Sequence, residues 1–129
     1  MKVLLDTHVI LWALRDPDRL TSVAREVIVD RGTELVCSAA SAWEIATKYR
    51  LGRLPGSEGL VAGYSDHLQR LGAIELPVSS RHGLIAGRLE WTHGDPFDRM
   101  LGAQSILEGL PLVTGDPALT TLSGVTVLW

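Results

Sequence analysis

The sequence predicts an α/β fold: a three-layer α/β/α sandwich whose central parallel sheet has four to five strands. Short apolar runs alternate along the chain with segments of helical periodicity, and this alternation is typical of a parallel sheet covered by helices on both faces. The 129 residues are 46% hydrophobic and 21% charged, which suits one core but not a second folded unit. We therefore expect residues 1–129 to form a single domain.

Five short apolar runs are the expected strands. They are residues 2–5 (KVLL), 35–38 (LVCS), 73–76 (AIEL), 110–114 (LPLVT) and 125–128 (VTVL). The single cysteine, Cys37, lies in the second run. It has no partner for an internal disulfide, and we expect it to be a small buried core residue.

The clearest helical segment covers residues 41–50, where apolar side chains recur at helical spacing and Gly52 stands where a helix would stop. A second covers residues 96–108, with Phe97, Met100 and Leu101 in its apolar stripe. Further helices are expected at residues 22–30, 59–71 and 80–89.

The apolar N-terminus looks like a secretion signal, but Asp6 and His8 interrupt it and no small-residue cleavage site follows. No apolar run is long enough to cross a bilayer, so we expect a cytoplasmic protein with no membrane contact. The net charge of −3 argues against a broad basic face that binds nucleic acid by counterion release. Contact with nucleic acid would have to be local, or helped by bound cations.

The stretch HGDPFDRML, residues 93–101, places two aspartates where a helix is expected to begin. Asp95 before Pro96 suits an N-cap followed by proline at the first helical position, and Asp98 falls in the first turn, where negative charge suits the helix dipole. Asp116 likewise precedes a proline and has a capping explanation. Each of these acids, taken alone, has a structural role available to it.

Two other acids also have a structural role available to them. Asp6 follows the first expected strand and can cap the next helix. Glu44 lies four residues before Lys48, the favourable order for a surface ion pair worth about 0.3 kcal/mol.

Taken together, the acids favour a different interpretation, because ligands of parallel α/β sheets gather outside the carboxyl ends of the strands. Asp6, Glu44 and Asp116 are expected at that edge, and Asp98 joins them if its helix begins there. Carboxylates about 4 to 5 Å apart repel by roughly 3 to 4 kcal/mol per pair at an effective dielectric near 20, so such a cluster must bind protons or cations. Oxygen ligands suit Mg²⁺ or Mn²⁺, which support phosphodiester hydrolysis.

Four blocks of the sequence resemble motifs of a known protein family. They are LLDTHVILWAL at residues 4–14, SAASAWEIATKYRLGRL at 38–54, HGDPFDRMLGAQ at 93–104 and LVTGD at 112–116. In this order they resemble the PIN-domain ribonucleases, and specifically the VapC-type toxins of type II toxin–antitoxin systems. The resemblance implies a PIN-like fold and a Mg²⁺-dependent endoribonuclease that acts on RNA. It implies that Asp6, Glu44, Asp98 and Asp116 are the catalytic, metal-binding acids. It further implies supporting roles for Thr7, Asp95 and Thr114.

The resemblance also implies a cognate antitoxin and a homodimer. Apolar residues compatible with a partner surface are Leu11, Trp12, Leu14, Leu51, Leu54 and Leu60. Candidates for contact with substrate phosphate are Arg50, Arg53 and Arg99.

Two alternatives remain at this point. The first is a non-catalytic PIN-like domain that binds RNA or a protein through the same acidic edge. The second, a phosphatase or phosphoryl-accepting domain, fits poorly, because His8 stands where a phosphatase of the haloacid dehalogenase type has its second aspartate, and no lysine follows Leu112. A zinc site is not expected, because the four histidines are scattered along the sequence. His8 and His93 adjoin motif acids, and we expect them to lie in turns or in the outer shell of the site.

Overall fold

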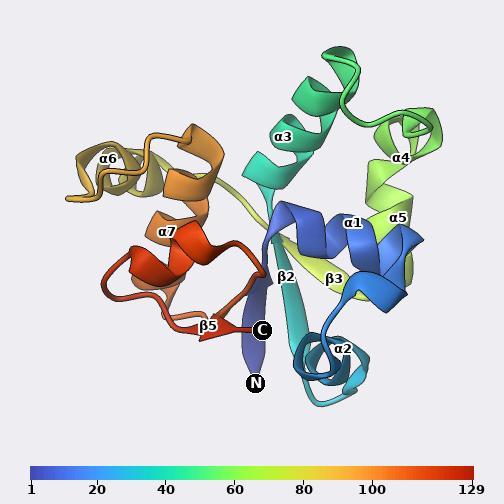
Figure 1. The fold of residues 1–129 in the computed structure, drawn as a ribbon, viewed down its shortest axis with the longest axis horizontal. Helices are drawn as coiled ribbons and strands as arrows, with labels where there is room; N and C mark the ends of the chain where they lie inside the picture. Colours follow the sequence, from blue (N-terminus) through green and yellow to red (C-terminus); the bar gives the residue numbers. More distant parts are fainter.

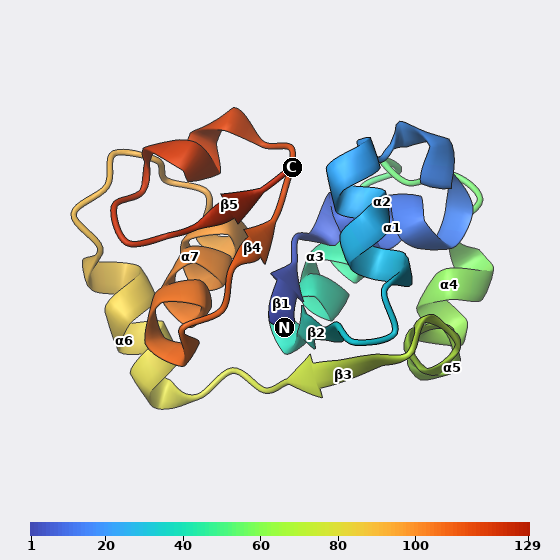
Figure 2. The ribbon, with the colours of Figure 1, turned by 90° about the horizontal axis from the view of Figure 1, so that it is seen from below.

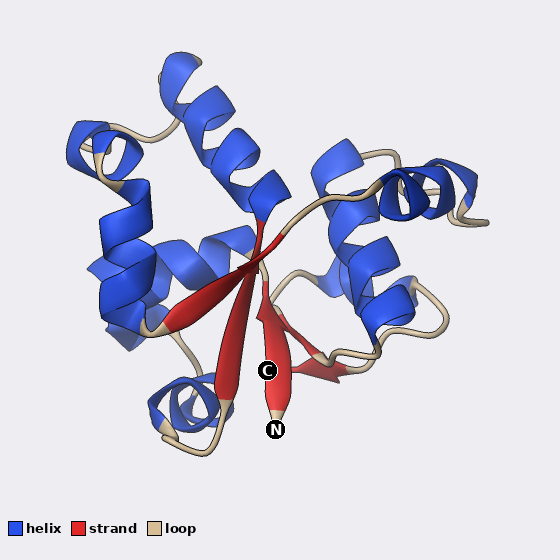
Figure 3. Cartoon of the chain, turned by 180° about the vertical axis from the view of Figure 1, so that it is seen from behind, coloured by secondary structure: helices blue, strands red, loops and turns tan.

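The computed structural model describes residues 1–129 and contains one sheet of five strands in the order β3-β2-β1-β4-β5. All four pairs of neighbouring strands are parallel, and helices lie on both sides of the sheet (Figure 3). The strands are β1 (Lys2–Leu5), β2 (Glu34–Ser38), β3 (Ala73–Leu76), β4 (Leu112–Val113) and β5 (Val127–Leu128). The predicted α/β/α fold with a parallel sheet is confirmed, and the sheet has five strands.

The helices fall into two groups, with α6 and α7 on one side of the sheet and α1, α2, α4 and α5 on the other (Figures 1 and 2). They are α1 (Thr7–Arg15), α2 (Ser22–Val29), α3 (Ala39–Arg50), α4 (Glu58–Ala62), α5 (Tyr64–Leu71), α6 (Ser80–Arg88) and α7 (Pro96–Glu108), with short 3-10 helices η1 (Pro17–Arg19) and η2 (Pro117–Thr121). None of them combines the length and the apolar character needed to cross a bilayer.

Several element boundaries differ from the prediction, including the strand expected at 125–128, which is only Val127–Leu128. Three of the differences have a clear local reason. The helix expected at 59–71 is two helices, α4 and α5, which meet at Gly63; glycine inside a helix is destabilising by about 1 kcal/mol relative to alanine. The strand expected at 110–114 is shorter because Pro111 has no N–H group for the ladder, and the Leu110 N–H bonds to the Ser105 carbonyl at the end of α7. Helix α3 starts at Ala39, earlier than expected, because the Ser38 side chain accepts a hydrogen bond from the Ala40 N–H.

The core has two parts, one on each face of the sheet. On β1, Val3 and Leu5 pack toward α1, α2 and α5, while Leu4 packs with Leu101 of α7 and Leu119 of η2. This alternation follows from the period of two along a strand. Cys37 of β2 is fully buried, as predicted.

The carboxyl ends of three neighbouring strands lead directly into the segments that carry acids. β1 leads into α1, β2 into α3 and β4 toward η2. Because these strands are parallel and adjacent, their following residues meet at one edge of the sheet.

Candidate active site

Asp6 is the N-cap of α1, and its side chain is held on both oxygens. Its Oδ1 accepts a hydrogen bond from the Thr7 N–H (2.7 Å), and its Oδ2 accepts one from the Thr114 Oγ1 (2.6 Å). The residue is only 3% exposed. Burial raises the pKa of Asp6 above its ordinary value, although the nearby His8 and the two hydrogen bonds oppose this effect, and the charge of Glu44 adds to it.

The two threonines expected to support the site connect its elements. Thr114, which directly follows β4, donates to Asp6 and accepts a hydrogen bond from the Asp116 N–H (3.0 Å). The Thr7 Oγ1 lies 2.9 Å from the Ser41 Oγ, and this contact ties α1 to α3. Ser41 was not among the predicted site residues, although it lies three residues before Glu44 and therefore on the same side of α3.

Glu44 lies in the second turn of α3 and is 5% exposed. Its Oε2 is 2.6 Å from the Lys48 Nζ, which confirms the predicted pair, but the pair is not at the surface on the glutamate side. The other oxygen, Oε1, is buried and has no hydrogen-bond partner. A buried carboxylate oxygen without a partner is costly, and it is a group that a cation would satisfy.

Asp98 lies in the first turn of α7, and its Oδ2 is 2.6 Å from the His93 Nε2. Burial raises the pKa of Asp98 to about 6, the hydrogen bond from His93 opposes this rise, and the charges of Asp6, Asp95 and Asp116 add to it. These three charges act on Asp98 because α7 begins at the edge of the sheet where the other acids lie.

The two remaining aspartates cap helices through one oxygen each. The Asp95 Oδ1 accepts hydrogen bonds from the Phe97 N–H (2.9 Å) and the Asp98 N–H (3.0 Å), so the predicted N-cap of α7 is confirmed. The Asp116 Oδ1 accepts from the Ala118 N–H (2.9 Å) at the start of η2. Capping leaves the Asp116 Oδ2 for another ligand.

His8 contacts both the Asp6 carboxylate and the loop after β4. Its Nε2 accepts a hydrogen bond from the Gly115 N–H (3.1 Å). The Nδ1 is 3.3 Å from the Asp6 Oδ2. Only roles in turns or in the outer shell of the site were expected for His8 and His93. The signal for a closer role was that both residues adjoin acids in the sequence.

Three of the four acids therefore contact a basic side chain nearby in the sequence. Asp6 contacts His8, Glu44 contacts Lys48 and Asp98 contacts His93. No three acidic, histidine or cysteine side chains are close enough together in this arrangement to ligate one ion. The metal-binding role of the acids stays a prediction. Their chemistry still fits a hard divalent cation, because the set offers carboxylate oxygens alone.

The arginines expected to contact phosphate differ from one another. Arg50 and Arg53 are exposed at the end of α3 and in the loop that follows. The Arg99 guanidinium instead donates hydrogen bonds to four backbone carbonyls, those of Ala86, Leu89, Trp91 and His93. Most of its donors are thus engaged within the protein, and contact of Arg99 with phosphate stays a prediction that nothing in the structure tests.

The residues expected on a partner surface also divide. Leu11, Trp12 and Leu54 line a cavity of about 300 Å³ together with Arg15, Asp16 and Arg19, and Leu51 is 50% exposed. Leu60 is buried and Leu14 packs against the core. The expectation was wrong for Leu60, because the loop after α3 folds back onto the body of the protein, where the Arg15 guanidinium donates to the Ser57 hydroxyl. Leu14 is partly buried, as Trp12 is, and its place on a partner surface stays a prediction.

The comparisons with known proteins agree with this fold. The family model described as "PIN domain" matches residues 3–124. Ribonuclease VapC22 of Mycobacterium tuberculosis is 29% identical over 117 residues, which cover 91% of this chain and 88% of that protein. Ribonuclease VapC16 of the same organism is 41% identical over 58 residues, but these cover only 45% of this chain and 41% of that protein.

Solved structures show the same fold at low sequence identity. The structure of VapBC2 from Rickettsia felis, bound to a DNA fragment from its promoter, contains a chain 15% identical with a TM-score of 0.72, covering 98% of this chain and 97% of that one. A chain in the structure of FitAB bound to the IR36 DNA fragment is 18% identical with a TM-score of 0.62, covering 98% and 93%. A chain of FitAcB from Neisseria gonorrhoeae is 20% identical with a TM-score of 0.60, covering 98% and 96%.

Proposed function

This chain belongs to the PIN domain family, and we propose that it is a Mg²⁺- or Mn²⁺-dependent endoribonuclease that acts as the toxin of a toxin–antitoxin pair. Its similarity to two ribonucleases of the VapC type supports the choice of RNA as substrate. The net reaction adds water across a phosphodiester bond, so that one product ends in a phosphate monoester and the other in a hydroxyl.

The observation that carries the proposal is the buried, unpartnered Oε1 of Glu44, in the same site as three aspartates. We propose that Asp6, Glu44, Asp98 and Asp116 hold the cation. When bound, the cation supplies positive charge that stabilises the negative charge developing on the phosphate, and it attracts the substrate to a protein of net charge −3.

The other residues of the site hold these carboxylates in place. Thr114 fixes the orientation of Asp6, and the contact between Thr7 and Ser41 keeps α1 against α3, the helix that carries Glu44. The His93 Nε2, 2.6 Å from the Asp98 Oδ2, holds that carboxyl in one orientation. Pre-oriented ligands of this kind reduce the reorganisation needed during the reaction.

The partner proposal concerns the cavity beside α1. Its apolar residues Leu11, Trp12 and Leu54 lie next to Arg15 and Arg19, a combination that suits an antitoxin segment with apolar and acidic side chains. Arg50 and Arg53 remain candidates for contact with RNA phosphate. We further propose a homodimer that acts in the cytoplasm, where its RNA substrates are.

The test is cleavage of a structured RNA by the purified protein. We expect cleavage with Mg²⁺ or Mn²⁺, none with EDTA, and a loss of at least about 100-fold in Glu44→Gln and Asp98→Asn, beyond the usual effect of removing an outer-sphere partner of a metal. Asp66→Asn on α5 is the matched control, because Asp66 is an exposed aspartate on a helix that carries none of the four acids.

Two outcomes would contradict the proposal in different ways. Cleavage that persists in EDTA would exclude the metal. RNA binding without cleavage, together with no uptake of Mn²⁺ in calorimetry, would favour the alternative of a non-catalytic RNA- or protein-binding domain.

A further inference from the structure

Residues 89–95 connect α6 to α7 and lie beside the proposed active site. They contain Trp91, His93 and Asp95, and Arg99 of α7 reaches back to this connection. We propose that Arg99 is a positioning residue: through the 89–95 connection it sets where Asp98 and the segment beginning at Asp116 lie relative to each other. This inference rests on the proposed function, because it assigns a purpose to the placement of two proposed cation ligands.

One guanidinium organises four carbonyls. The Arg99 Nε donates to the Ala86 carbonyl (2.9 Å) and its Nη2 to the Leu89 carbonyl (2.7 Å). These carbonyls lie at the end of α6, where helical N–H donors run out. The Nη1 donates to the carbonyls of Trp91 (2.9 Å) and His93 (3.0 Å). Arg99 thus caps α6 and fixes the backbone of the connection at two further points.

The connection in turn contacts both acid-bearing segments. On one side, the His93 Nε2 is 2.6 Å from the Asp98 Oδ2. On the other, the Trp91 Nε1 donates to the Thr121 Oγ1 (2.9 Å) in η2, the helix that Asp116 caps. The rings of Trp91 and His93 also pack together, with centroids 4.8 Å apart. A chain of direct contacts therefore runs from α7 through the connection to η2.

The geometry of the four bonds distinguishes this role from contact with substrate. Four hydrogen bonds use most of the five N–H groups of a guanidinium, and their acceptors lie on two different segments. A lysine ammonium keeps the positive charge but has three donors on a single atom. Arg99→Lys would therefore preserve an electrostatic contact with phosphate and lose the organisation of the connection.

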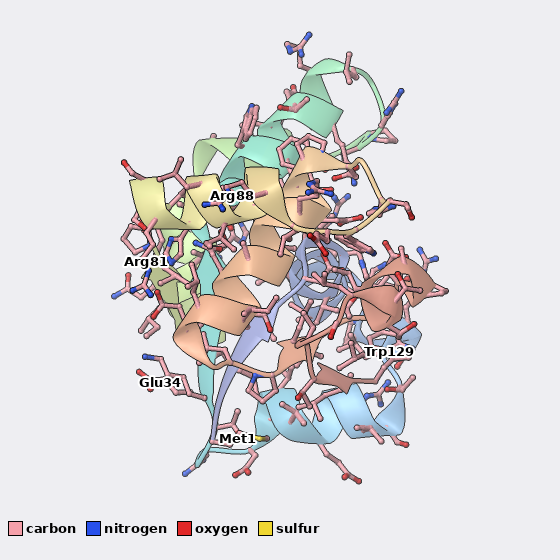
Figure 4. The ribbon with its side chains drawn as sticks, turned by 90° about the vertical axis from the view of Figure 1, so that its left-hand side faces the viewer. Met1, Glu34, Arg81, Arg88 and Trp129 are labelled. Carbon is pink, nitrogen blue, oxygen red and sulfur yellow. The ribbon has the colours of Figure 1, made fainter.

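The experiment compares Arg99→Lys and Arg99→Gln with Arg88→Lys. Arg88 is an exposed arginine of α6 (Figure 4), and it makes none of the hydrogen bonds described for Arg99. Three quantities are measured: hydrogen exchange of residues 89–98 in the metal-free protein, Mn²⁺ affinity by calorimetry without RNA, and kcat and KM for RNA cleavage.

We expect both Arg99 variants to exchange faster over residues 89–98 and to bind Mn²⁺ about 10-fold more weakly, at the lower end of the range for lost outer-sphere partners. We expect kcat to fall while KM changes by less than about twofold, since the lost interaction positions ligands and does not bind substrate. Arg88→Lys should match the wild type in all three.

Wild-type exchange and Mn²⁺ affinity in Arg99→Lys would overturn the inference, and a raised KM with unchanged kcat would return Arg99 to phosphate binding. If the wild-type protein proves inactive on RNA, the exchange and Mn²⁺ measurements still decide the role of Arg99.

If the Arg99 variants do not fold, Trp91→Phe removes the bond between the connection and η2 alone, whereas Thr121→Val removes it together with the bond from the Thr121 hydroxyl to the Ala118 carbonyl within η2. Faster exchange over residues 117–121 and weaker Mn²⁺ binding would support the inference, and unchanged values in both variants would overturn it.

Discussion

Thr114 donates a 2.6 Å hydrogen bond to Oδ2 of Asp6, although 108 positions separate the two residues. The contact follows from strand pairing. Leu5 of β1 is in register with Val113 of β4, so the residues that follow the two strands lie side by side. Both residues are buried, at 3% and 1% exposure. The orientation of the Asp6 carboxylate is thus determined by a neighbouring strand from the other end of the sequence.

Replacing Thr114 with Val should destabilise the protein more than replacing it with Ser. Valine keeps the shape but removes the hydroxyl that donates to Asp6 and accepts from the Asp116 N–H. Because a hydrogen bond to a charged group contributes about 1.5–3 kcal/mol, we expect Thr114→Val to lower the free energy of unfolding by about that amount. Urea unfolding in EDTA measures this, and equal stability of the Val and Ser variants would contradict it.

The metal-free protein should show a stability penalty that grows with pH, and part of this penalty is due to Asp98. The pKa of Asp98 in the folded protein, about 6, lies above the ordinary value of 3.8, mainly because of burial. The folded state therefore holds this proton more tightly than the unfolded state. The resulting contribution to the free energy of unfolding is fully present below about pH 4 and is lost as the pH rises through 6. Asp98→Asn removes the titrating group.

We expect Asp98→Asn in EDTA to be more stable than the wild type at pH 7.5 by about 1–2 kcal/mol. This is less than the free energy that corresponds to the whole shift in the pKa of Asp98, because the substitution also alters the hydrogen bond with His93. At pH 4.5 the difference should shrink. Urea unfolding of both proteins at the two pH values measures this, with Asp66→Asn as the exposed control. A difference that is the same at both pH values would refute the assignment to Asp98.

Gly115 should not tolerate a side chain while Trp129 is in place. A Cβ at position 115 would lie 2.7 Å from two atoms of the Trp129 ring, closer than packed carbon atoms approach. We expect Gly115→Ala to cost about 1–3 kcal/mol, as for other overpacked sites. In a Trp129→Ala background the cost should largely vanish, so a double-mutant cycle by urea unfolding tests the contact. Additive effects would show that the two residues do not interact.

Cys37 should be unreactive in the native protein. Its thiol is fully buried in β2, and burial raises its pKa to about 12, with the charge of Glu75 adding to the effect. Because the thiolate is the reactive form, a disulfide reagent at pH 8 should label Cys37 only as the protein unfolds. Rapid labelling without denaturant, at the rate seen in urea, would contradict the buried placement.

Several parts of the structure could be predicted from residues that are close together in the sequence. The Asp95-Pro96 start of α7 and the pairing of Glu44 with Lys48 depend on residues within a few positions of each other, and both occur as predicted. The strand that carries Cys37 was identified from its apolar run in the same way. Local signals of this kind survive folding because capping and periodicity act within one element.

Arg99 shows where such signals end. It was one of three arginines predicted to contact phosphate. The four carbonyls that accept its hydrogen bonds lie 6 to 13 positions away, and their convergence depends on how α6 packs against α7. Nothing in the local sequence distinguishes an arginine facing solvent from one that caps a neighbouring helix. The same holds for the bond between Trp91 and Thr121.

The amino-acid order by itself determined the alternation of strands and helices, the helix caps, and which acids follow which strands. Only the packed molecule decided which oxygens of those acids are held, which one is left without a partner, and which arginine is engaged. The reason is that caps and periodic faces arise from neighbours along the chain, whereas the remaining contacts require distant elements to meet at one edge of the sheet.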